Sequence, residues 1–378
     1  EKMYEIIDRY IDRLMTSSPE MPLWNIESIK QGKKPGWNYI DGCMTTSLME
    51  MYFTTGDRKY LDFVISFVDY YVREDGSILG YEKEKYSTDD ISESRILFDL
   101  YSFTGKEKYR KAIENAYSQI LTHPRTKEGN FWHRGIYHDQ VWLDGLYMGQ
   151  PFYAQSIVDF CDDEKWNDVF SQFKSAHDLL WDEERGLYVH ANDTSREMDW
   201  CDKESGKSKC VWLRAEGWFL MAMVDTYEIA QKHTELSKTL IPMLKNAIDR
   251  LLPYKDGKTN MFYQLVDEKD MEGNYPETSG SAMVAYALMK GERLGMLEKG
   301  YGKIGEEILE GIRRTYLKSE DGVLHLYGIC ASAGLGPGPD NRRDRDGSPR
   351  YYLSEKQGVD NQHGAAACMM AYSEYVRR

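Results

Sequence analysis

A repeated helix–turn–helix pattern decides the fold of this chain. Residues 48–63 read LMEMYFTTGDRKYLDF, and residues 97–112 read LFDLYSFTGKEKYRKA. In each stretch one apolar helix ends at a Thr-Gly pair and the next begins with Lys-Tyr. Glycine best tolerates the left-handed conformation that closes a helix, which explains its place here. A looser third copy, IVDFCDDEKWNDVF, occupies residues 157–170. Such a recurrence indicates an architecture of repeated helical hairpins.

Further helix pairs continue the rhythm without the signature. The expected pairs are residues 213–231 with 236–252, 279–294 with 301–316, and 359–377 with a first helix at 3–16. Six hairpins of alternating inner and outer helices predict an all-α (α/α)6 barrel, with residues 1–378 as a single catalytic domain. An open solenoid of the same hairpins is the alternative.

Short segments with alternating apolar residues lie between the helix pairs. They follow Asp-Gly or Arg-Gly turns and occupy residues 75–81, 185–191, 256–267 and 321–328. Such turns favour β-hairpins. We expect these hairpins to decorate one rim of the barrel and to shape a pocket there.

Composition excludes several classes of function. The 378 residues carry a net charge of −14, so no basic field is available for nucleic acid. Arg342, Arg343 and Arg345 alternate with aspartates and are interpreted as a solvated loop. The sequence contains no run of 18 apolar residues, so no membrane span is predicted. Either a cytoplasmic or a periplasmic location fits the chain.

The six cysteines form no C-x-x-C pair, and no phosphate-binding, dinucleotide or zinc motif occurs, so we expect neither a metal nor a cofactor. Cys201 and Cys210 are spaced to close a short disulfide; the alternative is that they are buried apolar side chains.

The segment HDQVWLDGLYMGQPFYA, residues 138–154, contains the first candidate for catalysis. Asp139 fits a helix N-cap, whereas Asp144 lies inside the helical run beside Trp142 and Tyr147. Apolar neighbours raise the pKa of a carboxyl group and keep it able to donate a proton. We therefore interpret Asp144 as an acid catalyst.

A second acidic pair precedes another helix, in YSTDDISESRILFD at residues 86–99. Asp89 and Asp90 are able to cap that helix, but Ser92 would serve equally well. One aspartate is therefore free for another role.

Residues 209–228, KCVWLRAEGWFLMAMVDTYE, combine Trp212, Arg214, Glu216 and Trp218 ahead of an apolar helix. An arginine fork that binds carboxylate, together with two indole faces for stacking, is the minimal site for a uronic acid. The alternative is a surface Arg214–Glu216 pair. His190 and the His133–Arg134 pair are ambiguous between structural and binding roles.

Four motifs together resemble glycoside hydrolase family 105, the unsaturated rhamnogalacturonyl hydrolases. They are WLDGLYM (142–148), RAEGW (214–218), ETSGSAMVAYALMKGERLG (277–295), and ASAGLG with RDGSPRYYLSE (331–336 and 345–355). The resemblance extends from about Trp37 to the C-terminus, and it implies an (α/α)6 barrel. It also implies a substrate, an oligosaccharide that begins with a Δ4,5-unsaturated uronic acid.

The resemblance implies a role for each candidate residue. Asp144 would protonate C4 of the substrate's enol ether, and water would then add at C5. Asp89 would be the second carboxylate near the ring. The sugar subsite would be lined by Trp142, His190, Trp212, Arg214 and Trp218, and by Arg134, which stands where family members often have lysine.

One residue departs from the family pattern. Many members have Asn or Gly where Glu216 stands, and an acid there would either redirect Arg214 or bind a neutral sugar hydroxyl. This departure leaves open whether the leaving sugar is rhamnose or another sugar. Beside the unsaturated rhamnogalacturonyl hydrolase, the alternatives are an unsaturated glucuronyl hydrolase, a conventional inverting glycosidase, or a sugar-binding protein without catalysis.

Overall fold

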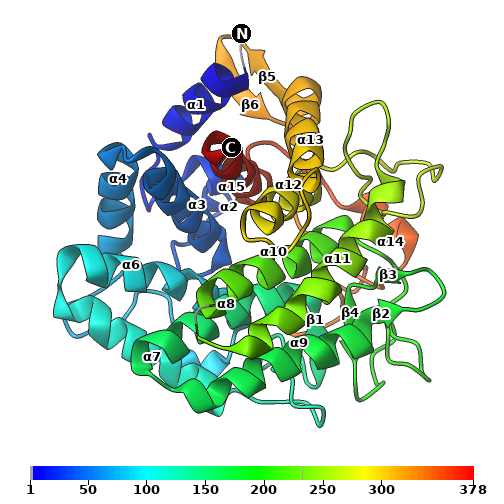
Figure 1. Cartoon of the computed structure of the whole chain (residues 1–378), viewed down its shortest axis with the longest axis horizontal. Coiled ribbons are helices and arrows are strands. Elements are labelled where there is room, and N and C mark those ends of the chain that lie inside the picture. The colour runs from blue at the N-terminus through cyan, green and yellow to red at the C-terminus, as the bar shows by residue number, and fades with distance from the viewer. Residues whose placement is uncertain (1–2, 232) are drawn as a thin grey trace.

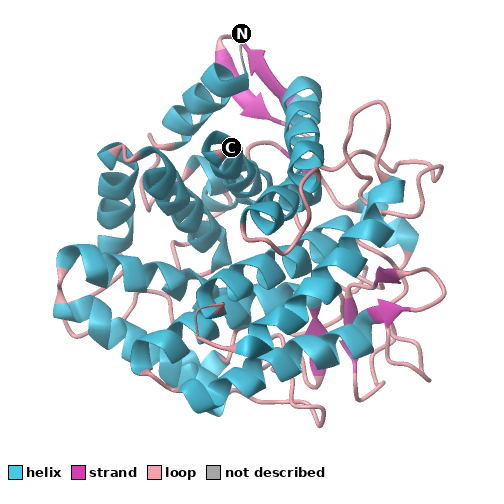
Figure 2. Cartoon of the chain, in the orientation of Figure 1, coloured by secondary structure: helices cyan, strands magenta, loops and turns pink. Residues whose placement is uncertain are grey.

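A computed structural model describes residues 3–231 and 233–378 as a ring of helices (Figures 1 and 2). The inner helices are α3 (Tyr39–Thr55), α6 (Arg95–Thr104), α8 (Leu143–Phe160), α10 (Leu213–Ala230), α12 (Thr278–Arg293) and α15 (Gln362–Arg377). Each inner helix contacts the next one in this order, and α15 contacts α3. The ring is therefore closed, which confirms the barrel and excludes the open solenoid.

A second layer of helices surrounds the ring. The outer helices are α1 (Met3–Leu14), α4 (Arg58–Asp69), α7 (Glu107–Thr122), α9 (Trp166–Leu180), α11 (Leu240–Leu251) and α13 (Tyr301–Tyr316). The last hairpin joins the two ends of the chain as expected, because the Tyr372 hydroxyl of α15 donates to the Tyr4 carbonyl of α1 at 3.0 Å.

The repeated Thr-Gly stops behave as predicted. Gly56 ends α3 at φ 72° and Gly105 ends α6 at φ 67°, both in the left-handed region. In the third copy Cys161 adopts the same conformation at φ 56°. A local αL cap therefore closes α8 although no glycine is present.

The predicted rim hairpins are only partly correct. Residues 321–328 contribute to a hairpin of β5 (Leu317–Glu320) and β6 (Val323–Leu326), turning at Asp321 and Gly322, which both have positive φ. It lies beside α1 and α13 (Figure 1). Segments 75–81 and 256–267 form only isolated bridges, because no continuous strand lies beside them to complete a ladder.

The remaining short elements connect the helices. They are α2 (Ile26–Lys30), α5 (Thr88–Ile91), α14 (Pro349–Ser354), β1 (Gln140–Trp142), β2 (Trp181–Asp182), β3 (Leu187–Tyr188), β4 (Ala191–Asp193), β7 (Ile329–Cys330) and β8 (Gln357–Gly358). Strands β1 and β4 pair antiparallel, with Trp142 opposite Ala191. This pairing brings residue 190 next to the start of α8.

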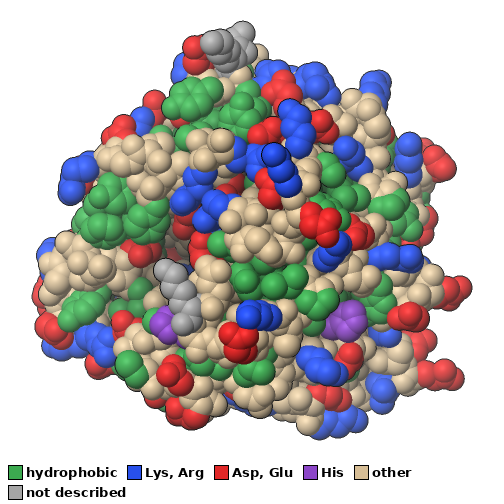
Figure 3. Space-filling view, viewed as in Figure 1, with side chains coloured by type: hydrophobic (Ala, Val, Ile, Leu, Met, Phe, Trp, Pro, Cys, Tyr) green, Lys and Arg blue, Asp and Glu red, His purple; other side chains and the backbone are tan. Residues whose placement is uncertain are grey.

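On the face seen in Figure 3, acidic and basic side chains are interspersed. None of the helices within 3–231 and 233–378 is long and apolar enough to cross a membrane.

Candidate active site

A pocket of about 860 Å³ opens at the N-terminal ends of the inner helices. The predicted residues that line it are Asp89, Arg134, Trp142, Asp144, Trp212, Arg214 and Trp218. His190 lies behind Asp144 instead of in the wall. None of the pocket-lining residues belongs to the four segments expected to be rim hairpins, so that part of the prediction was wrong.

The position of Asp144 is fixed by the β1–β4 pair. The Leu143 amide, at the first residue of α8, donates to the His190 carbonyl at 3.0 Å. Nε2 of His190 then lies 3.0 Å from Oδ1 of Asp144. The Asp144 side chain is 13% exposed, and it faces the pocket from the first turn of α8.

The predicted direction of the Asp144 pKa was wrong. Burial acts as expected and raises it, but His190, through its charge when the ring is protonated and through its hydrogen bond, holds the pKa below its ordinary value together with His133. The free protein therefore keeps Asp144 ionised at neutral pH. The apolar neighbours lie beside Asp144 in the sequence, whereas the imidazole comes from a residue 46 positions away.

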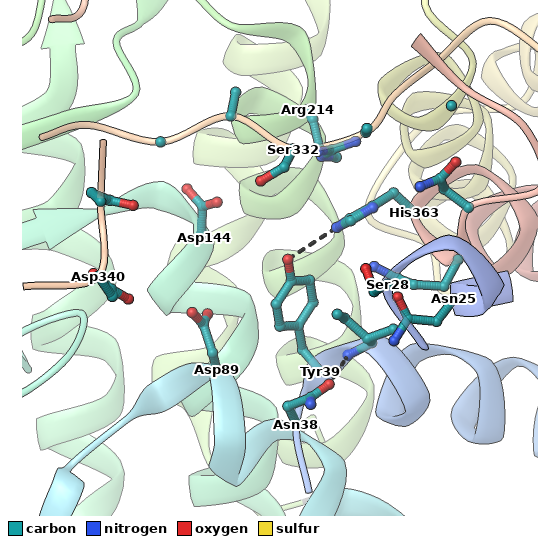
Figure 4. A pocket seen from close by; sticks show the side chains of 18 of the residues that line it. Asn25, Ser28, Asn38, Tyr39, Asp89, Asp144, Arg214, Ser332, Asp340 and His363 are labelled. Carbon is teal, nitrogen blue, oxygen red and sulfur yellow. Dashed lines mark hydrogen bonds between the residues drawn. The ribbon is translucent and has the colours of Figure 1, made fainter. Parts of the chain in front are cut away.

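Asp89 lies in the short helix α5. The N-cap of α5 is Ser87, whose hydroxyl accepts from the Asp90 amide at 3.2 Å. Neither aspartate nor Ser92 caps the helix. Asp89 is thereby free to face the pocket, 3.5 Å from Nε2 of His133. Burial, followed by the neighbouring Asp89, raises the pKa of Asp90 to about 6. In Figure 4, Asp89 and Asp144 lie on the same side of the Tyr39 ring.

Asp139 does not cap α8. It takes a left-handed conformation at φ 56° in the turn before β1, and α8 begins after Trp142 without a side-chain cap. The N-cap interpretation of Asp139 was therefore wrong.

Arg214 is 2% exposed and enters the pocket from the first turn of α10. Its Nη1 donates to the Cys330 carbonyl at 2.6 Å and to the Ser279 hydroxyl at 3.1 Å. The guanidinium lies 4.8 Å from the Trp212 ring centroid. Among the described residues only Nη1 has a hydrogen-bond partner, so the rest of the fork is available to an anionic ligand.

Glu216 does not pair with Arg214. It is 1% exposed and accepts a hydrogen bond from the Tyr188 amide at 2.8 Å. Burial raises its pKa to about 8, against the lowering effect of that bond. Glu216 does not line the pocket, so it neither redirects Arg214 nor reaches a sugar hydroxyl there.

The loop of residues 340–346 also differs from its prediction. It was interpreted as solvated, but Asp340, Asn341 and Arg345 line the pocket. Arg134 forms an ion pair with Asp340, and Arg345 pairs with Glu355 at 3.1 Å. Arg134 therefore lies at one side of the pocket, and Asp340 already neutralises its charge.

Three further polar residues of the pocket, Tyr39, Gln362 and His363, were not predicted. The Tyr39 hydroxyl lies 3.0 Å from Nε2 of His363 (Figure 4). Nδ1 of His363 and both amide atoms of Gln362 are buried without a partner among the described residues. A signal existed for these two, since polar side chains at the start of an apolar helix face the same end as Asp144. Nothing local in the sequence links Tyr39 to His363.

The suggested disulfide is absent. Cys201 and Cys210 are free thiols, which contact the Met198 carbonyl at 3.1 Å and the Gly347 carbonyl at 3.3 Å. Within the described residues, no group of three or more His, Cys, Asp or Glu side chains is arranged to hold a metal ion.

Comparison with known proteins places the chain in a family. The model of Glycosyl Hydrolase Family 88 matches residues 6–378. A family 105 glycoside hydrolase of C. acetobutylicum superposes with a TM-score of 0.89 at 37% identity, over 99% of each chain. The unsaturated rhamnogalacturonyl hydrolase YesR of Bacillus subtilis is 25% identical over 68% of this chain and 72% of its own.

A more distant structure shares the fold. The unsaturated glucuronyl hydrolase of Bacillus sp. GL1 superposes with a TM-score of 0.66 at 13% identity, over 98% of this chain and 96% of that one. The chain thus belongs to the family 88 and 105 glycoside hydrolases, the unsaturated uronyl hydrolases, and within them to family 105.

Proposed function

We propose that this protein removes a Δ4,5-unsaturated galacturonic acid from the non-reducing end of rhamnogalacturonan oligosaccharides produced by a lyase. The observation that carries the proposal is the position of Asp144, which faces the same pocket as a buried, partly unpaired Arg214. The relationship to YesR supports rhamnogalacturonan as the substrate.

Arg214 supplies the recognition of the uronate. Its unpaired fork matches a carboxylate in two-point geometry. The pocket also lies at the N-terminal ends of α8, α10 and α15, where the helix dipoles favour an anion. An acidic protein thereby holds an anionic sugar through a local field. Trp142, Trp212 and Trp218 line the pocket and supply apolar surface beside the sugar.

Asp144 carries the chemistry. A bound uronate, in a pocket from which water is displaced, raises the pKa of Asp144 and loads it with a proton. Asp144 gives that proton to C4, the positive charge develops at C5 next to the ring oxygen, and water adds there. The proton of the water returns to the Asp144 carboxylate. The resulting hemiketal opens to a ketone, C1 becomes a hemiacetal, and its collapse releases the leaving sugar.

Family membership favours hydration over conventional inversion. Inverting glycosidases place an acid and a base about 6.5–9.5 Å apart, on opposite faces of the sugar. This chain belongs to the unsaturated uronyl hydrolases. Hydration needs one proton donor, Asp144, which leaves Asp89 to hold the sugar ring.

Three substrates test the proposal. The double bond absorbs in the ultraviolet, so wild-type protein should abolish the absorbance of an unsaturated galacturonyl-rhamnose disaccharide and release rhamnose. Galacturonic and glucuronic acid differ only at C4 and give the same unsaturated ring, so the second substrate differs in its anomeric linkage and leaving sugar. Faster turnover of such a disaccharide would replace rhamnogalacturonan by a glucuronate-containing glycan as the source of the substrate. Equal hydrolysis of the saturated galacturonyl-rhamnose would overturn hydration, and binding without turnover would indicate a sugar-binding protein.

A further inference from the structure

A buried tyrosine on α14 completes a hydrogen-bond chain that ends at Asp144. The Tyr352 hydroxyl lies 2.8 Å from Nδ1 of His190, whose Nε2 lies 3.0 Å from Oδ1 of Asp144. Tyr352 and His190 are both fully buried. We propose that Tyr352 is a positioning residue that fixes the protonation of His190, and through it the oxygen of Asp144 that carries the reactive proton. This inference rests on the proposed function.

The proton positions follow from the partners. An ionised carboxylate only accepts hydrogen bonds, so Nε2 of His190 must carry the hydrogen that faces Asp144. A neutral ring then has a bare Nδ1, which needs a donor. Burial raises the pKa of Tyr352 well above its ordinary value, so its hydroxyl keeps a proton to donate. Among the described residues, that hydroxyl hydrogen-bonds to His190 alone.

Both rings are fully buried and pack against Trp212. The His190 ring lies 4.7 Å from Trp212 and 5.3 Å from Trp142, measured between centroids. Its carbonyl is bound by the first amide of α8, while the Tyr352 carbonyl accepts from Gln264 at 3.4 Å. The bond between the two side chains therefore sets the tautomer without a competing rotamer.

This hydrogen-bond chain distinguishes the two carboxylate oxygens of Asp144. Oδ1 accepts from His190 whether or not Asp144 is protonated, so the proton destined for C4 resides on Oδ2. After the transfer, Oδ1 keeps the same bond and Oδ2 takes the proton from the attacking water. Other titratable groups that face Asp144 or its histidine neighbours include His133, Asp89, Tyr39 and Tyr137, which stacks on His133.

Tyr352→Phe removes the donor and leaves the shape. Nothing then holds Nδ1 of His190 bare. Once Asp144 is protonated, the ring can take the Nδ1–H tautomer and accept the acid's proton at Nε2. The reactive proton then lies on Oδ1, turned toward His190, instead of on Oδ2. We expect kcat to fall about 10- to 100-fold, the size typical of an orienting partner. KM should stay within about threefold, and the alkaline limb of the kcat profile should move to higher pH, because the new bond stabilises the protonated acid.

Tyr188→Phe is the matched control. Its hydroxyl also meets a histidine Nδ1, that of His177 at 2.5 Å, and the residue is equally buried, but His177 does not contact Asp144. This variant should lose similar stability and keep the wild-type pH profile.

A second background separates positioning from packing. His190→Gln retains a donor toward Asp144 and offers Tyr352 no ring nitrogen. In that background Tyr352→Phe should change kcat by less than about twofold, because the two residues act through one interaction. An undiminished effect there would mean that Tyr352 acts through packing, and a wild-type pH profile for Tyr352→Phe alone would overturn the proposal as well.

A readout that does not depend on turnover completes the test. The ¹⁵N chemical shifts of His190 in the resting protein should show the Nε2–H tautomer in wild type, with the Nδ1 signal moved by a hydrogen bond that Tyr352→Phe removes. A neutral Nδ1–H ring in wild type would overturn the proposal. Failure of the wild type to consume the double bond, with these shifts as expected, would count against the proposed function and leave the hydrogen-bond assignment standing.

Discussion

Nε2 of His190 lies 3.0 Å from Oδ1 of Asp144, and this contact reverses the effect of burial on the acid. An apolar setting alone would keep Asp144 protonated. The imidazole instead holds the resting carboxyl ionised, so the proton must be loaded when the substrate binds. The free and substrate-bound proteins therefore differ in the charge of one group.

Asp144→Asn should abolish turnover and leave the fold intact. The amide still accepts the His190 bond through its oxygen, but it has no proton to give to C4. We expect kcat to fall by at least about 10²- to 10⁴-fold, the usual contribution of a general acid. The measurement is the loss of ultraviolet absorbance, with circular dichroism to check folding.

Asp139→Asn is the control for that variant. Asp139 lies five residues earlier, outside the pocket and at φ 56°, a conformation that asparagine tolerates. Its activity should match wild type. An Asp144→Asn protein that retains a tenth of wild-type activity would exclude Asp144 as the acid.

The pH dependence should differ between the two kinetic parameters. The ratio kcat/KM reports the free protein, in which the pKa of Asp144 is lowered, whereas kcat reports the complex, in which the bound uronate raises it. Because the protonated form is the reactive one, each parameter falls as pH rises through the relevant pKa. The alkaline limb of kcat should therefore lie at higher pH than that of kcat/KM. Coincident limbs would contradict proton loading by the substrate.

Arg214→Lys should weaken binding more than chemistry. Lysine keeps the charge but lacks the fork that reaches the Cys330 carbonyl and a carboxylate together. We expect KM to rise about tenfold or more, since hydrogen bonds to charged groups contribute about 1.5–3 kcal/mol, and kcat to change far less. Steady-state kinetics on the unsaturated disaccharide provide the test.

Arg125→Lys is the corresponding control. Arg125 makes a two-point pair with Asp168, with both N–O distances at 2.7 Å, and does not line the pocket. Its KM should equal that of wild type. If Arg214→Lys lowered kcat without any change in KM, Arg214 would not be the residue that holds the uronate.

The barrel was predictable because its signals are local. The Thr-Gly stops at Gly56 and Gly105 mark helix ends through a conformation that the residue type itself favours. The expected hairpin at 256–267 failed because alternation of apolar residues indicates a strand only where a partner strand exists. Strand pairing depends on residues that are distant in the sequence, so local alternation does not reveal it.

The site was predictable as a set of residues but not as a set of charges. Asp144, Trp212 and Arg214 all start inner helices, so the fold brings them to one end. The sign of the Asp144 pKa shift depends on His190, 46 residues away, and on a contact that only β1–β4 pairing creates. Helix geometry alone predicts where Glu216 lies. Two residues after Arg214, it is turned by about 200° around the helix axis and must face the opposite side of α10.

Glu216→Gln should stabilise the protein, and increasingly so as pH rises. In the folded state the pKa of Glu216 is about 8, because burial disfavours the charged form, whereas the unfolded chain titrates near its ordinary value of about 4.3. Between these values unfolding releases a proton, so the wild-type free energy of unfolding falls as pH rises from about 4.5 to 8.

Glutamine resembles the protonated acid and still accepts from the Tyr188 amide, so the variant escapes this loss. We expect a gain of about 1–3 kcal/mol at pH 8 and almost none at pH 4.5, measured as the difference in Tm at the two pH values, with activity unchanged because Glu216 does not line the pocket. Glu298→Gln, at an exposed carboxyl paired with Lys245 at 2.6 Å, should show no such gain. An equal Tm difference for Glu216→Gln at both pH values would mean that burial does not raise the pKa of the Glu216 carboxyl.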